Sequence, residues 1–132
     1  MKKAIALLLA LVMVFALCAC GGGDKGTADN GEKVVKIGVF EPASGDSGAG
    51  GKKEMLGMQY ANQETPTVEI GGETYKVELV YSDNGSDSAK AVSAASKLVN
   101  EKVSLVLGSY GSGVSIAASD TFKQAGIPAI GV

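Results

Sequence analysis

Four apolar segments of strand length occur between residues 33 and 132, and helical patterns separate them. The first, KVVKIGVF (33–40), is rich in β-branched residues and is bounded by turn residues, as strands commonly are. The third, VSLVLG (103–108), is almost wholly apolar, which predicts a central strand buried on both faces. The fourth begins in IPAIGV (127–132).

The second strand has a different pattern. Val77, Leu79 and Tyr81 alternate with polar residues, after a turn at Gly71 and Gly72. Such alternation is typical of a strand with one face partly exposed to water. We therefore expect this strand at an edge of the sheet.

Three helices are predicted between these strands. The first, residues 51–63, carries a broad apolar face that suits packing on a sheet. The second follows Asp87, whose side-chain oxygen can accept a hydrogen bond from a free amide of the first turn. The third follows the 103–108 strand, and Gly126 is placed to end it. The apolar stripe of the second helix comprises Ala91, Ala95, Leu98 and Val99, and that of the third comprises Val114, Ala117, Ala118 and Phe122.

This order of elements, β-α-β-α-β-α-β, predicts an α/β fold with a parallel sheet and right-handed crossovers. An edge-like second strand and a buried third strand favour the sheet order 2-1-3-4, counted along the chain, as in flavodoxin-like folds. Sheets of this kind bind ligands at the carboxyl ends of the strands, near the switch point between strands 1 and 3. The loops after those two strands are therefore the places to look for chemistry.

The first twenty residues predict export. A basic start is followed by an apolar run from Ala4 to Ala19, which is typical of a secretory signal. The run is shorter than the roughly 20 residues that a membrane-spanning helix needs. Leu17-Cys18-Ala19-Cys20 resembles the bacterial lipobox, which implies cleavage before Cys20 and attachment of diacylglycerol to its sulfur. We therefore predict a signal peptide over 1–19 and a chain anchored by lipid outside the cytoplasmic membrane.

Residues 20–32 then form the predicted junction between anchor and domain. GGGDKGTADNGE (21–32) holds five glycines and no large apolar residue, so it reads as a flexible tether. The folded part is expected over 33–132.

The composition excludes several classes of function. The 132 residues include no histidine and no arginine, with 12 basic residues against 14 acidic ones. Without histidine, the chain contains no Ser-His-Asp or Cys-His mechanism and lacks the commonest metal ligand. Nothing suggests the basic, arginine-bearing face that nucleic acids require. We expect no cofactor, no bound metal and no nucleic-acid partner.

ASGDSGAGGKKEM (43–55) has the glycine content of a phosphate-binding loop but not its pattern. In a P-loop reading, Asp46 stands where the first glycine is required, and Lys53 stands where the hydroxyl that binds Mg²⁺ is required. The dinucleotide pattern that starts at Gly48 also fails, since its final glycine falls on Lys53. We interpret the segment as a mobile turn whose glycines allow close approach of the backbone.

GSYGSGVS (108–115) follows the third strand and is no nucleophile elbow, because Tyr110 and Val114 stand where glycines are needed around Ser112. The loop does place Ser112 at the start of a helix, beside the amides of Gly113 and the next two residues. Free amides and the helix dipole make an anion site, and a serine hydroxyl beside them can complete the grip on a carboxylate. Alternatively, Ser112 is only the N-cap of the helix. Both interpretations stay open at this point.

The stretches KIGVFEPASG, VELVYSDNGSDSAKAVSAASKLVNEKVSLVLGSYGSG and AASDTFKQAGIPAIGV, in this order, resemble extracytoplasmic solute-binding proteins of the branched-chain amino acid type, which feed ABC importers. The resemblance covers residues 35–132. It implies lobe 1 of a type I bilobal protein that closes on its ligand without catalysis. It also implies that Ser112 holds the ligand's carboxylate, with Gly113 beside it and Tyr110 placed to pack on the ligand. Gly50 takes the position where branched-chain binders often carry an aromatic residue.

Family members are much longer, so we expect this chain to be an N-terminal fragment that binds amino acids weakly or not at all by itself. The leading hypothesis is the substrate-binding lipoprotein of an ABC importer, with a permease and an ATPase as partners. Its ligand would be a branched-chain amino acid, although amides, urea and aromatic acids stay open. The alternatives are a ligand-sensing domain in signalling, a truncated fragment without function, and a surface enzyme.

Overall fold

The structure, a computed structural model, describes residues 31–132. The signal peptide predicted over 1–19, the lipidation predicted at Cys20 and the tether up to residue 30 lie outside the described residues. Within residues 31–132, no helix is long and apolar enough to cross a membrane.

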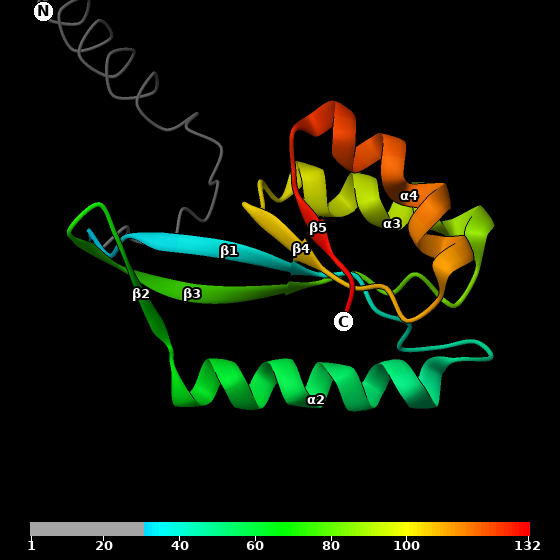
Figure 1. Ribbon diagram of the computed structural model, residues 1–132, viewed down its shortest axis with the longest axis horizontal. Helices are drawn as coiled ribbons and strands as arrows, with labels where there is room; N and C mark the ends of the chain where they lie inside the picture. Colours follow the sequence, from blue (N-terminus) through cyan, green and yellow to red (C-terminus); the bar gives the residue numbers. More distant parts are fainter. Residues whose placement is uncertain (1–30) are drawn as a thin grey trace, which may run out of the picture. The chain divides into compact units, whose positions relative to one another are not determined.

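Five strands form one sheet in the order β2-β3-β1-β4-β5 (Figure 1). β1 pairs in parallel with both β3 and β4, and β4 pairs in parallel with β5. These four strands are the four predicted from the sequence, and their order is the predicted 2-1-3-4, so the α/β fold with flanking helices is confirmed. The strands are β1 (Val34–Val39), β2 (Thr67–Ile70), β3 (Glu73–Tyr81), β4 (Leu105–Leu107) and β5 (Ala129–Ile130).

The prediction that the second parallel strand forms the sheet edge is wrong. β2, which the sequence analysis did not assign as a strand, pairs antiparallel with β3 and takes the edge position. The turn between them contains Gly71 and Gly72, whose φ values of 62° and 81° suit the two central positions of a tight hairpin. The alternation along β3 therefore reflects a half-exposed face and not a missing neighbour.

Three helices flank the sheet: α2 (Gly48–Glu64), α3 (Ser88–Asn100) and α4 (Ser112–Ala125). α3 and α4 lie together on one face, and α2 lies alone on the other (Figure 1). α3 begins as predicted, because the Asp87 carboxylate accepts a hydrogen bond of 2.8 Å from the Ala89 amide. α4 ends at Gly126, whose φ of 69° is the left-handed conformation expected of a helix-terminating glycine.

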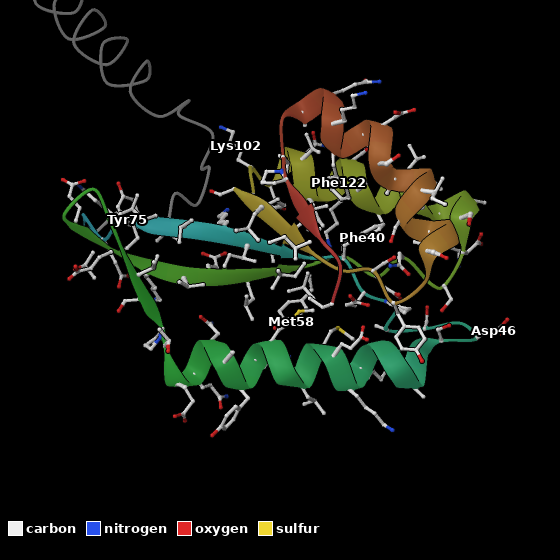
Figure 2. The ribbon with its side chains drawn as sticks, in the orientation of Figure 1. Phe40, Asp46, Met58, Tyr75, Lys102 and Phe122 are labelled. Carbon is white, nitrogen blue, oxygen red and sulfur yellow. The ribbon has the colours of Figure 1, made fainter. Side chains whose placement is uncertain are left out.

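The core lies between the sheet and the pair α3 and α4. Phe40, at the end of β1, meets Phe122 of α4 edge to face, with ring centroids 5.4 Å apart (Figure 2). Both predicted apolar stripes point into this core, except that Val99 and Ala117 are only partly buried at its margin. The fully buried cluster comprises Phe40, Ala91, Ala94, Ala95, Leu98, Val103, Val106, Val114, Ala118 and Phe122.

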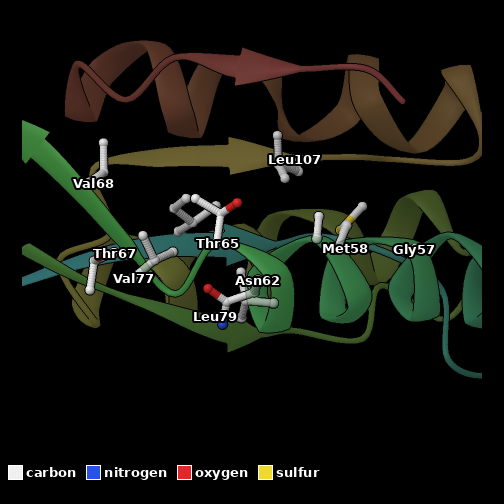
Figure 3. A pocket seen from close by; sticks show the side chains of 11 residues that line it. Gly57, Met58, Asn62, Thr65, Thr67, Val68, Val77, Leu79 and Leu107 are labelled. Atoms are coloured by element: carbon white, nitrogen blue, oxygen red, sulfur yellow. The ribbon is translucent and has the colours of Figure 1, made fainter.

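The opposite face of the sheet is covered much less completely. Only two residues of α2, Gly48 and Gly51, are buried, and both belong to its first turn. Leu56 and Tyr60 of the same helix are 63% and 65% exposed. Farther along, a cavity of about 440 Å³ separates α2 from the sheet (Figure 3). It is lined by Ile37, Gly57, Met58, Ala61, Asn62, Thr65, Thr67, Val68, Val77, Leu79 and Leu107.

Candidate functional site

The predicted site residues gather at the carboxyl edge of the sheet. β1 ends at Val39 and leads through residues 40–47 into α2, while β4 ends at Leu107 and leads through residues 108–111 into α4. Because β1 and β4 are parallel neighbours, the first turns of both helices start from the same edge. Gly50 lies on one of these turns, and Ser112 and Gly113 lie on the other.

Ser112 is the first residue of α4 and not its cap. Gly111 holds the N-cap position, and no side chain caps the helix. The interpretation of Ser112 as an N-cap is therefore wrong. Its side chain is exposed, and its hydroxyl makes no hydrogen bond to any described residue.

An anion site at Ser112 requires free amides, and only some of the amides at the start of α4 are free. Those of Val114 and Ser115 both donate to the Gly111 carbonyl, at 3.0 and 3.1 Å, so they are not free. Among the described residues, the amides of Ser112 and Gly113 have no acceptor. The site therefore offers one hydroxyl and two amide donors at the positive end of a helix, which is the chemistry that a carboxylate needs.

Tyr110 and Gly50 meet each other directly. A Cβ atom on residue 50 would lie 2.7 Å from Cε2 and 2.8 Å from Cζ of the tyrosine ring, so the ring occupies the space above this glycine. The ring remains 52% exposed at the edge where the ligand is expected. An aromatic residue thus stands near the predicted position, but it comes from the β4–α4 loop.

The β4–α4 loop is fixed by its own side chains. The hydroxyl of the buried Ser109 donates to the Gly111 carbonyl at 3.0 Å and lies 3.0 Å from the hydroxyl of Ser115. These contacts link the loop to the first turn of α4. Ser112 and Tyr110 therefore lie on a segment whose conformation is stabilised by these hydrogen bonds.

Residues 43–55 are not a single turn, because those from Gly48 onward belong to α2. The part before the helix is held by Asp83, which follows β3. Its carboxylate accepts from the Ala43 amide at 2.8 Å, the Ser44 hydroxyl at 2.7 Å and the Gly85 amide at 2.8 Å. Desolvation raises the pKa of Asp83, but the hydrogen bonds from Ser44, Gly85 and Ala43 outweigh it and leave the pKa below its ordinary value.

Glycines allow this loop its close approaches, as predicted. At Gly45 a Cβ would overlap the carbonyl group of Gly85, and at Gly51 it would overlap the carbonyl oxygen of Pro42. Gly45 also has a φ of 77°, which disfavours any other residue. Asp46, which breaks the P-loop pattern, lies at the exposed tip of the loop (Figure 2).

Glu41 is the residue that the sequence analysis missed. It follows β1, is 1% exposed, and accepts a hydrogen bond of 2.9 Å from the Tyr110 amide through Oε2. Its Oε1 has no hydrogen-bond partner, and neither has Oε2 of Glu54 from α2. Burial and, after it, the interaction with the Glu54 carboxyl group raise the pKa of Glu41 to about 7, although the hydrogen bond from the Tyr110 amide acts in the opposite direction. An acidic residue directly after a buried apolar run was the available signal.

The apolar cavity under α2 contains none of the predicted site residues. No charged side chain lines it, and its walls are the sheet face and the side of α2 that faces the sheet (Figure 3). We therefore interpret the cavity as a result of the loose packing of α2 on the sheet and not as part of the candidate site.

Comparison with known proteins identifies relatives for most of the chain. A model of the periplasmic binding proteins matches residues 34–132. A Leu/Ile/Val-binding protein homolog of Brucella abortus is 33% identical over 116 residues. That alignment covers 88% of this chain and 29% of the relative, so the chain spans less than a third of the relative's length.

Solved structures give the same result. A leucine-binding protein of Thermotoga maritima superposes with a TM-score of 0.67 at 34% identity, over 74% of this chain and 27% of that one. A branched-chain amino acid binding protein of Streptococcus pneumoniae, in complex with isoleucine, gives 0.66 at 35% identity, over 75% and 28%. A solute-binding protein of an ABC transporter from Rhodopseudomonas palustris, in complex with benzoate, gives 0.64 at 28% identity, over 74% and 27%.

Proposed function

Because the chain belongs to the periplasmic binding protein family, we propose that it serves as the substrate-binding component of an ABC importer. Residues 33–132 would form part of the first of two lobes, and the ligand would be bound between the lobes and released chemically unchanged. The partners would be the permease and ATPase subunits of the importer.

The observation that carries this proposal is the start of α4. Ser112 presents an exposed hydroxyl, and the amides of Ser112 and Gly113 have no acceptor among the described residues. Three donors at a helix N-terminus fit one carboxylate. Isoleucine and benzoate, the ligands of two similar structures, share that group and differ in the rest of the molecule.

The neighbouring side chain suits the apolar part of such a ligand. Tyr110, which is half-exposed, lies next to the donors in the β4–α4 loop. We therefore propose a small carboxylate with an apolar side chain, and a branched-chain amino acid as the first candidate.

The family is extracytoplasmic, and we propose that this chain is tethered to the membrane. The signal peptide over 1–19 would be removed, Cys20 would carry diacylglycerol, and residues 20–32 would separate the domain from the lipid headgroups. The lipobox-like order of Leu17, Cys18, Ala19 and Cys20 supports this.

Calorimetry on the complete protein encoded by the gene tests the carboxylate site. We expect binding of L-isoleucine, no measurable binding of L-isoleucinamide, and a loss of about tenfold or more in Ser112→Ala, because a hydrogen bond to a charged group contributes about 1.5–3 kcal/mol. Ser119→Ala is the matched control, since Ser119 lies exposed on the same helix and its hydroxyl donates only to the Ile116 carbonyl. Equal binding of acid and amide, or unchanged affinity in Ser112→Ala, would contradict the proposal.

A further inference from the structure

Two carboxyl groups lie together directly behind the candidate site. Glu41 is buried at the end of β1, and Glu54 reaches it from the second turn of α2. Each has an oxygen that is shielded from solvent and has no donor: Oε1 of Glu41 and Oε2 of Glu54. The two side chains interact with each other. Buried acceptors without a donor are unfavourable, and a proton shared by the two carboxyl groups would supply one.

The pair connects the three segments that form the site. Glu41 belongs to the β1–α2 loop, and its other oxygen accepts a hydrogen bond from the Tyr110 amide of the β4–α4 loop. Glu54 belongs to the helix whose first turn carries Gly50, on which the Tyr110 ring rests. A Cβ on Gly108 would overlap Oε1 of Glu41, so the loop backbone also passes close over the carboxyl group.

We propose that Glu41 and Glu54 are positioning residues for the carboxylate site, and that they hold the β4–α4 loop against α2 by sharing one proton. This inference rests on the proposed function, because it concerns the affinity of that site for the carboxylate of its ligand. It adds to that function a dependence of binding on pH.

The direction of the pH dependence follows from charge. Glu54 is the charged group that acts on Glu41; from the β4–α4 loop the contact is the Tyr110 amide, and from the β3–α3 loop Asn84 binds the neighbouring Phe40 carbonyl at 3.0 Å. With one shared proton the pair carries a single negative charge. When that proton leaves, two charges repel each other behind a site that must accept a carboxylate.

The pKa of Glu41, about 7, places this change in the neutral range. A ligand carboxylate at the start of α4 is repelled less by the protonated pair, so affinity is highest below pH 7 and falls as the pH rises through it. A ligand that raises the pKa of the pair by about one unit loses about tenfold in affinity over that interval.

The test measures L-isoleucine binding by calorimetry at pH 5.5, 7.0 and 8.5, using the complete protein. Wild type should lose about tenfold in affinity from pH 5.5 to 8.5. Glu54→Gln supplies a permanent donor to Glu41, so it should bind with a pH-independent affinity close to that of wild type at pH 5.5. Glu64→Gln, at the exposed end of α2, is the matched control and should retain the wild-type pH profile.

A second measurement needs no ligand. The NMR shift of the Tyr110 amide proton should titrate with a midpoint near 7 in wild type, because this amide donates to Glu41, and it should not do so in Glu54→Gln. If Glu54→Gln does not fold, Glu41→Gln replaces it in this measurement. Glutamine at position 41 keeps an acceptor for the Tyr110 amide but does not titrate, so the midpoint near 7 should again be lost.

The outcomes separate the two proposals. Binding by wild type with no pH dependence overturns the positioning pair and leaves the proposed function intact. If wild type binds no carboxylate at any pH, the proposed function is overturned. The titration of the Tyr110 amide then tests the carboxyl pair separately. A midpoint near 7 in wild type that disappears in Glu54→Gln supports the shared proton. If wild type shows no midpoint near 7, the shared proton is overturned.

Discussion

The two faces of the sheet differ in how their helices are held. On the side of α3 and α4, side chains interdigitate, and Leu98, Val106 and Ala118 are completely buried. On the side of α2, the only buried residues of the helix are Gly48 and Gly51 of its first turn, which lie against the β1–α2 loop, and residues farther along the helix line a cavity of about 440 Å³.

This difference indicates which contacts position the residues of the candidate site. The site lies at the end of the sheet where both helices begin, and it is held there by polar contacts that do not depend on the core. Asp83 fixes the β1–α2 loop, and Glu41 fixes the β4–α4 loop. A helix can therefore be well placed at its first turn while most of its length packs loosely.

Truncation of one large side chain on each face should give the largest contrast. Leu98→Ala removes a fully buried side chain from the core, and we expect a loss of about 2–5 kcal/mol in the free energy of unfolding. Met58→Ala removes a partly buried side chain that lines the cavity under α2, so its loss should stay below about 1 kcal/mol. Urea denaturation measures both, and equal losses would show that the two faces are packed alike.

Addition of one methyl group on each face should give a smaller contrast, of opposite sign. A Cβ on Gly38 would lie 3.0 Å from Val106 Cγ2 and 3.1 Å from Leu98 Cδ1, so Gly38→Ala should destabilise the protein by about 1–3 kcal/mol. Gly57 lies inside α2 with nothing within 4 Å of its Cβ position. Gly57→Ala should therefore stabilise by up to about 1 kcal/mol through helix propensity. Thermal melts of the two variants should shift in opposite directions, and shifts of the same sign would argue against the contrast.

The helix caps should give the smallest effect. Asp87 caps α3 through its carboxylate, and Asp87→Ala should lose about 1 kcal/mol. Ser47, at the N-cap of α2, makes no side-chain capping bond, so Ser47→Ala should change the free energy of unfolding by a few tenths of a kcal/mol at most. Denaturation midpoints at one pH compare them, and a cost at Ser47 equal to that at Asp87 would show that α2 is capped after all.

The sequence predicts the fold where one pattern has one structural cause. Alanines and Leu98 recur at helical spacing because a single helix face is buried, and VSLVLG is almost wholly apolar because its strand has a neighbouring strand on each side. β2 escaped prediction because all four of its residues are exposed, so burial leaves no trace in its sequence.

The position of the candidate site could be predicted from the sequence, but the contacts between its residues could not. Topology alone brings Ser112, Gly113, Tyr110 and Gly50 to one edge. The role of Glu41 depends on an amide 69 positions away in the chain, and no local pattern records such a contact. The choice of Gly111 over Ser112 as the N-cap likewise depends on the backbone of the preceding loop.

The contact between Gly50 and Tyr110 means that a substitution at one of these two positions constrains the residue at the other. The space beside Gly50 on the first turn of α2 is taken by the ring of Tyr110. A ring introduced at position 50 requires that the tyrosine be given up or turned away. We therefore expect the residues at positions 50 and 110 to change together among related chains.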